Sequence, residues 1–156
     1  MMIIIIRKAT VQDIDLLIKL RFDYLNEDNC NPTQDEKIAI QQQLEEYFEM
    51  HIQDGTFIGA IAEIDNKTVS VAYLAIAEKP ANTTFITGKT GTLLNVLTYP
   101  EYRRKGIATK VINFLIGEAK NAGVSSIDLS ATNDGKPLYE KMRFTTSTYV
   151  AMRMIL

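Results

Sequence analysis

The alternation of apolar and polar positions divides the first third of the chain into one strand and two helices. An apolar run over residues 1–6 predicts a buried strand, which we place at residues 3–8. Apolar residues then recur at helical spacing from a cap at Thr10 to about Leu25, which predicts the first helix. A second helix is expected over residues 33–54, between a capping-box start and a glycine stop.

The middle and the end of the chain read as strands alternating with helices. Apolar segments at residues 56–64 and 68–77 flank an Asp-Asn-Lys turn, which predicts a hairpin, and residues 79–90 read as a polar loop. The further expected elements are a strand over 93–98, a helix over 105–121, a strand over 126–130, a short helix over 134–141 and a final strand or pair of strands over 146–156. This order indicates an α/β fold on a mixed sheet, and residues 1–156 are expected to form a single domain.

Composition and charge narrow the function classes. The 156 residues are 46% apolar and 23% charged, which is typical of a globular protein. The formal net charge of −2 gives no electrostatic reason to expect nucleic acid or an anionic membrane as a partner. Cys30 is the sole cysteine, and the short apolar N-terminus is followed at once by Arg7. These features favour a reducing, cytoplasmic location, with neither a secretory signal nor a membrane span.

The segment from Tyr99 to Ala108 is the strongest candidate for chemistry, because it joins a predicted strand to a predicted helix. Its basic and flexible members are Arg103, Arg104, Lys105 and Gly106. The first N–H groups of a helix lack partners within the helix, and the helix dipole favours an anion there. A glycine lets the backbone approach a ligand closely. The sequence therefore predicts a phosphate-binding turn of main-chain donors reinforced by three basic side chains.

Two motifs resemble the GCN5-related N-acetyltransferase (GNAT) family. Arg103-x-x-Gly106-x-Ala108 is similar to the family's Arg/Gln-x-x-Gly-x-Gly/Ala signature for acetyl coenzyme A (acetyl-CoA). Leu138-Tyr139-Glu140-Lys141-Met142-x-Phe144 is similar to its Leu-Tyr-Glu-Lys-x-Gly-Phe segment. The resemblance covers roughly residues 92–145. It implies acetyl-CoA as the cofactor and the family's fold, a mixed central β-sheet with helices on both faces.

The resemblance implies a set of cofactor contacts. Val96, Leu97 and Thr98 would pair with the pantetheine arm as an exposed strand edge. The pyrophosphate would be bound by Arg103 and by the main-chain N–H groups of Arg104, Lys105, Gly106, Ile107, Ala108 and Thr109. The Arg104 guanidinium or the Lys105 ammonium would meet the 3′-phosphate. Thr132 or Asn133 would replace an asparagine that the family often uses, and the sequence does not choose between them.

The resemblance also implies catalytic roles. Tyr139 matches the family's proton donor, and a phenol with a reference pKa of about 10 stays protonated at neutral pH. The N–H of Leu97 is the expected oxyanion donor, by analogy with family members. No covalent acyl-enzyme is implied, so no nucleophilic side chain is required. Ile127 stands where some members place a glutamate base, so the base is unassigned, and a water chain or an already neutral amine are the alternatives.

The acceptor is expected to be a small-molecule or peptide amine. Arg21, Tyr24 and Glu27 are the residues expected to face it. Residues 27–54 carry eight acidic side chains and one basic one, which favours a solvated helix face over an acidic rim that attracts a cationic amine. The single histidine, His51, has no evident partners, so no metal site is expected.

Three functions are weighed on this sequence. The leading hypothesis is acetyl transfer from acetyl-CoA to a primary amine by direct attack in a ternary complex. The second is a non-catalytic acyl-CoA sensor or interaction domain, which the absent glutamate and Arg143 at the family's glycine position allow. The third, a nucleic-acid-binding module, is disfavoured by the acidic charge balance. The family often dimerises, so a homodimer is among the expected assemblies.

Overall fold

The computed structural model describes residues 2–156, so Met1 of the predicted N-terminal run lies outside the described residues. Five strands and four α-helices follow one another along the chain. They are β1 (Ile5–Lys8), α1 (Ile14–Glu27), α2 (Gln34–Asp54), β2 (Phe57–Ile64), β3 (Lys67–Glu78), β4 (Lys89–Thr98), α3 (Ile107–Asn121), β5 (Ser126–Asp128) and α4 (Lys136–Lys141). Two short 3-10 helices, η1 (Val11–Asp13) and η2 (Pro100–Tyr102), precede α1 and α3.

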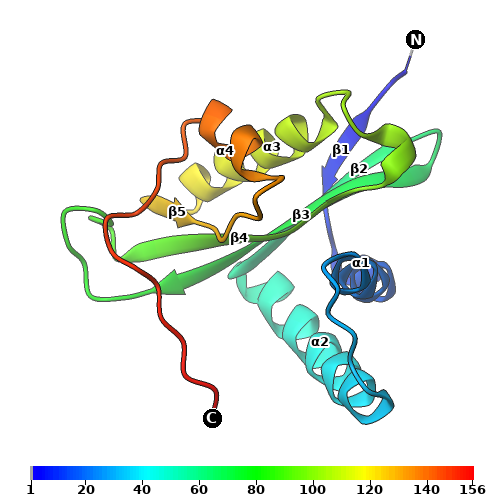
Figure 1. The fold of residues 1–156 in the computed structure, drawn as a ribbon, viewed down its shortest axis with the longest axis horizontal. Coiled ribbons are helices and arrows are strands. Elements are labelled where there is room, and N and C mark those ends of the chain that lie inside the picture. Colours follow the sequence, from blue (N-terminus) through cyan, green and yellow to red (C-terminus); the bar gives the residue numbers. More distant parts are fainter. Residues whose placement is uncertain (1) are drawn as a thin grey trace.

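The sheet has the strand order β1-β2-β3-β4-β5. Neighbouring strands are antiparallel except β4 and β5, which run parallel. Helices α3 and α4 cover one face of the sheet, and α1 and α2 lie on the other (Figure 1). The expected fold class, a mixed sheet with helices on both faces, is confirmed.

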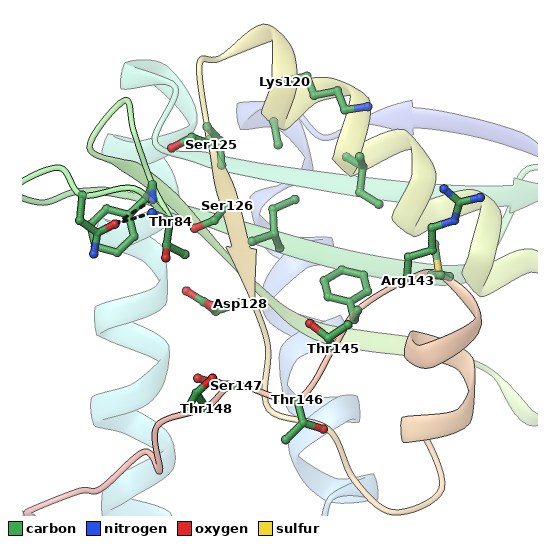
Figure 2. Close-up of a pocket in the computed structure, with 18 of the residues that line it drawn as sticks. Thr84, Lys120, Ser125, Ser126, Asp128, Arg143, Thr145, Thr146, Ser147 and Thr148 are labelled. Carbon is green, nitrogen blue, oxygen red and sulfur yellow. Dashed lines mark hydrogen bonds between the residues drawn. The ribbon is translucent and has the colours of Figure 1, made fainter.

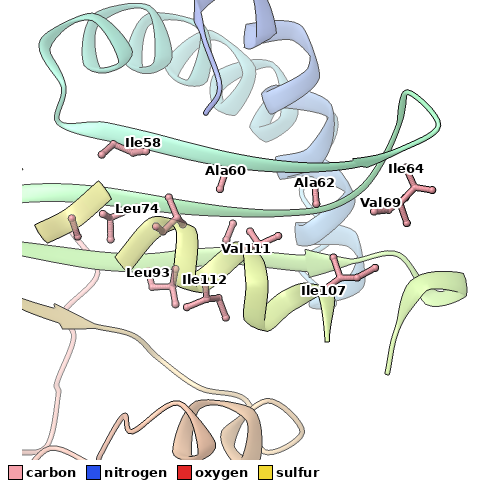
Figure 3. Close-up of a cluster of buried hydrophobic side chains, with 13 residues drawn as sticks. Ile58, Ala60, Ala62, Ile64, Val69, Leu74, Leu93, Ile107, Val111 and Ile112 are labelled. Atoms are coloured by element: carbon pink, nitrogen blue, oxygen red, sulfur yellow. The ribbon is translucent and has the colours of Figure 1, made fainter. Parts of the chain in front are cut away.

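Two apolar clusters hold the helices to the sheet. On one face, Ile107, Val111 and Leu115 of α3 pack against β2, β3 and β4 (Figure 3). They recur at intervals of four because such residues line one side of a helix. On the other face, Leu17 of α1 and Phe48 of α2 pack with strand residues in a second cluster. The sheet is therefore buried on both faces, which explains why its central strands are almost wholly apolar.

The local signals at the element ends are confirmed. Thr33 and Glu36 form the capping box at the start of α2, and Gly55 ends that helix in the left-handed conformation. Asp65 and Asn66 both have positive φ, 50° and 63°, as a two-residue hairpin turn requires. The hairpin of β2 and β3 was therefore readable from its turn residues.

Both chain ends depart from expectation. The final strand predicted over residues 146–156 is wrong, because none of these residues is in a strand. They form no sheet with β5, which pairs only with β4 among residues 2–156 (Figure 2). At the other end, Ile3 and Ile5 are 71% and 57% exposed, whereas Ile4 and Ile6 pack against the α3 cluster. The expected buried strand is thus an edge strand that is buried on one face.

Candidate active site

A splayed strand pair opens one side of β4. The last pair between β4 and β5 is Thr92 with Asp128, and from there β4 continues to Thr98 paired with β3 only. The backbone there has a defined direction, because the Tyr99 N–H bonds the Val69 carbonyl of β3 at 3.0 Å. Peptide groups alternate in direction along a strand, so the main chain of Leu97 faces β3 and that of Thr98 faces the open side. This direction favours Thr98 as a pantetheine partner and does not favour the Leu97 N–H as an oxyanion donor.

A β-bulge interrupts β4 at Asn95. Tyr73 pairs with Leu94 and Val71 pairs with Leu97, so the bulged strand holds one extra residue. Asn95 adopts a φ of 56° and is 1% exposed. Its Oδ1 accepts a hydrogen bond of 3.2 Å from Nη1 of Arg21 on α1, and its Nδ2 has no partner among residues 2–156. A buried donor without a partner in a bulge is typical of a functional position.

Sequence reasoning missed Asn95. The only signal was one polar residue inside the apolar run from Leu93 to Leu97. Asparagine is also among the few residues that enter the left-handed region readily. Neither property marks a site without knowledge of what faces it.

The predicted phosphate-binding turn has the backbone of an anion cradle. Arg104 and Gly106 have φ values of 63° and 76°, while Lys105 between them does not enter that region. Such alternation points successive N–H groups into one concavity, and α3 begins directly afterwards at Ile107. A Cβ placed on Gly106 would meet no heavy atom within 4 Å. The N–H groups and the space beside them fit a phosphate group.

The side chain of Arg103 makes contacts within the protein. Its Nε donates to the Thr98 carbonyl at 2.8 Å, and its Nη2 donates to the carboxylate of Glu27 at the end of α1. The two residues were expected to face the cofactor and the acceptor, respectively. Their side chains instead bond each other, which ties the start of the cradle to α1.

Tyr139 lies on α4, half-buried, with its ring edge-on to Phe144 at 5.9 Å between centroids. Burial raises the pKa of its phenol, and the neighbouring phenol of Tyr24 raises it further. Tyr139 and Val96 of β4 both border the apolar cluster under α3. The candidate proton donor therefore lies on the α3 side of the sheet, in its protonated form at neutral pH.

Arg21 and Tyr24 lie beside each other in the second half of α1. The Arg21 guanidinium lies 5.9 Å from the ring centroid of Tyr24, and burial raises the pKa of the Tyr24 phenol. Arg21 meets the bulge through Asn95, and Tyr24 is close enough to influence Tyr139. Of the three expected acceptor residues, Arg21 thus contacts β4 and Tyr24 lies beside Arg21, whereas Glu27 is turned to Arg103.

Thr132 and Asn133 remain separate alternatives for a cofactor contact. The Thr132 hydroxyl accepts the Gly135 N–H at 3.0 Å, and its carbonyl accepts the Lys136 N–H at 3.0 Å. Thr132 therefore stabilises the turn that leads into α4. Asn133 is exposed beside it. The contact with the cofactor stays a prediction for both residues.

Within residues 2–156, no group of His, Cys, Asp and Glu side chains is arranged to hold a metal ion. The same part of the chain has no helix with the length and apolarity that spanning a membrane would require. The acidic side chains of residues 27–54 are all exposed, as both a solvated helix face and an acidic rim require.

Comparison with known proteins agrees with this geometry. The model of the acetyltransferase (GNAT) family matches residues 20–144. A predicted acetyltransferase from Clostridium acetobutylicum, solved with acetyl-CoA, is 31% identical, with a TM-score of 0.85 and coverage of 97% of this chain and 96% of that one. The chain therefore belongs to the GNAT family.

Two more distant structures share the fold. A GCN5-related N-acetyltransferase from Ralstonia eutropha JMP134 is 22% identical, with a TM-score of 0.80 and coverage of 97% and 98%. Glucosamine-6-phosphate N-acetyltransferase from Arabidopsis thaliana is 19% identical, with a TM-score of 0.71 and coverage of 97% and 98%. A search of curated proteins gave no match.

Proposed function

We propose that this protein transfers an acetyl group from acetyl-CoA to a primary amine by direct attack in a ternary complex. The observation that carries the proposal is the turn at Arg104 and Gly106, whose two left-handed residues precede the start of α3. Main-chain donors in this arrangement bind diphosphates. The relative from Clostridium acetobutylicum, which has acetyl-CoA bound, supports the choice of cofactor.

The residues of this chain fit acetyl-CoA along its length. The cradle supplies N–H groups of residues 104–109 for the pyrophosphate, with the exposed Arg104 and Lys105 beside it for the 3′-phosphate. The open side of β4 near Thr98 supplies strand-like partners for the amides of the pantetheine arm. Arg103 and Glu27 hold the cradle against α1.

Tyr139 supplies the proton that the reaction needs. When bound, acetyl-CoA provides a thioester whose carbonyl carbon is open to attack by an amine nitrogen. The Tyr139 hydroxyl would donate its proton to the departing sulfur, because its raised pKa keeps it protonated. No carboxylate is assigned as the base, so the amine would attack after losing one proton to water. As the C–N bond forms and the C–S bond breaks, the nitrogen would release a second proton, which would return through water to the Tyr139 oxygen.

Titration calorimetry with acetyl-CoA and an assay for acetylated amines test the proposal together. We expect micromolar-range binding and a product with at least one class of primary amine. An absence of heat on titration would overturn cofactor binding.

The second candidate, a non-catalytic acyl-CoA sensor, is favoured by one observation: Ile127, at the family's glutamate position, is half-buried and cannot act as a base. Such a sensor would bind acetyl-CoA with the same affinity and acetylate no amine. Product formation therefore separates the two candidates, and binding alone does not.

A further inference from the structure

Arg21 is a half-buried cation without a carboxylate partner among residues 2–156. Its hydrogen bond is to the neutral amide of Asn95, and the nearby aromatic ring of Tyr24 is also uncharged. Lys19, on the same helix, is by contrast paired with Asp23 at 2.7 Å. A cation that is partly removed from water and faces neutral groups is poised to bind an anion.

The orientation of Asn95 adds a second donor at the same point. Because Arg21 can only donate, the atom of Asn95 that it meets must be the amide oxygen. The Nδ2 group is therefore left as a donor, buried and without a partner in residues 2–156. An unused guanidinium edge and an unused amide N–H side by side match the two oxygens of a carboxylate.

A cavity of about 260 Å³ between the two N-terminal helices and the sheet adjoins Arg21, and Asn95 lies behind Arg21, outside the cavity lining. Arg21, Tyr47, Tyr73 and Leu94 are among its lining residues, and no acidic side chain is. The Tyr73 hydroxyl is engaged with the Leu17 carbonyl, so this tyrosine presents its ring and not a free donor. The cavity therefore accepts an apolar or aromatic group beside one anion-binding corner.

We infer that the acceptor amine carries a carboxylate and an apolar side chain, as an apolar or aromatic amino acid does. The carboxylate would accept from Arg21 and from Nδ2 of Asn95, and the side chain would enter the cavity between α1 and α2. This inference rests on the proposed function. One guanidinium and one amide match a monoanion better than a phosphate, which would call for further cations.

Matched amine pairs test the inference. The panel contains phenylalanine and leucine, their amides, and spermidine, with acetyl-CoA as donor. We expect kcat/KM to be about 10²-fold higher for each acid than for its amide, since two hydrogen bonds to a charge are lost. Amidation makes the amine less basic and so favours the amide as nucleophile. A preference for the acid is therefore a stringent result.

Variants assign the preference to the donor pair. Arg21→Gln should remove the preference for the acid, Arg21→Lys should keep part of it, and Asn95→Asp should reverse it by placing a carboxylate at the same point. Lys37→Gln, which removes an exposed cation from α2, is the matched control and should keep the full preference. Acetyl-CoA affinity, measured by calorimetry on every variant, should stay within about 3-fold of the wild type.

The outcomes separate the inference from the function on which it rests. No acetyl-CoA binding by the wild type would overturn the proposed function. Binding without acetylation of either amino acid, faster acetylation of amides or spermidine, or an unchanged preference in Arg21→Gln would overturn the inference alone.

Discussion

The N–H of Phe144 donates to the carbonyl of Tyr139 at 3.0 Å and closes the end of α4. The Arg143 N–H donates to the Glu140 carbonyl at 3.0 Å in the same turn. The two bonds form a Schellman motif, which requires a left-handed residue after the helix. Arg143 is that residue, with a φ of 73°. The family's glycine position therefore keeps its geometry with an arginine, and the turn that carries Tyr139 is formed.

We predict that the stability of this turn depends on the residue type at position 143. Arg143→Gly should leave the free energy of unfolding unchanged or raise it by up to about 0.5 kcal/mol, because glycine enters the left-handed region without strain but costs backbone entropy. Arg143→Val should lower it by about 1–2 kcal/mol, because a β-branched residue is strained there. Urea unfolding of both variants measures the difference, and equal stabilities would contradict the left-handed turn.

Replacement of the Tyr139 hydroxyl should affect turnover alone. Tyr139→Phe should lower kcat by about 10²-fold or more, the range for loss of a general acid, with acetyl-CoA affinity unchanged. Tyr149→Phe, at an 87% exposed tyrosine, is the control and should retain full activity. Steady-state kinetics measures kcat, and calorimetry measures the affinity for acetyl-CoA. Full activity in Tyr139→Phe would show that Tyr139 is not the general acid.

The pH profile of the wild type follows from the same residue. Burial raises the pKa of Tyr139, so the acid stays protonated up to and beyond its reference pKa of about 10. We expect kcat/KM to rise with pH as the amine loses its proton, with no decline below about pH 10 from loss of this acid. A descending limb near neutral pH that disappears in Tyr139→Phe would show that the phenol titrates much lower.

Substitutions at Gly106 and Gly117 should differ in their effect on acetyl-CoA binding. Gly106→Val should weaken acetyl-CoA binding at least about 10-fold, because the backbone at φ 76° excludes a β-branched residue and the new side chain points where phosphate would bind. The Cβ that Gly117→Ala adds inside α3 would have no neighbour within 4 Å. This variant should leave acetyl-CoA binding unchanged and stabilise the helix by about 1 kcal/mol. Unchanged acetyl-CoA binding in Gly106→Val would show that the pyrophosphate does not bind at this turn.

An ion pair next to β1 should make stability sensitive to acid. Arg7 donates two hydrogen bonds to the Asp13 carboxylate, at 2.8 and 2.9 Å, and these lower the pKa of Asp13 below its usual range. A depressed folded-state pKa gives stability that is present above the unfolded value of about 3.9 and is lost as pH falls through the folded value.

The matching variant measures this contribution. Asp13→Asn should cost about 1 kcal/mol at pH 7, a modest figure because Arg7 is 36% exposed. Urea unfolding between pH 7 and pH 2 should show that cost shrinking below about pH 4. Glu46→Gln, at an exposed carboxylate of α2, should change stability little at any pH. A cost that stays constant down to pH 2 would contradict the assignment.

Much of the fold and the backbone shape of the turn before α3 could be read from the sequence. The Thr33 cap, the left-handed turn of Asp65 and Asn66 and the cradle before α3 are local, because neighbouring residues alone determine them. Asn95 was not readable, because its importance comes from Arg21, 74 positions away in the chain. The bond between Arg103 and Glu27 is likewise a long-range contact between residues that separately resemble ligand-binding groups. The strand predicted over residues 146–156 was wrong, because an apolar pattern does not show whether a partner edge is present and a strand forms only beside one.

The position of the pyrophosphate in a complex decides whether the turn at Gly106 binds acetyl-CoA. A crystal structure of this protein grown with acetyl-CoA should show the pyrophosphate oxygens within hydrogen-bond distance of the N–H groups of residues 104–109, and the thioester beside the Tyr139 hydroxyl. Density for the cofactor at any other place, with the turn at Gly106 free of phosphate, would show that this turn does not bind acetyl-CoA.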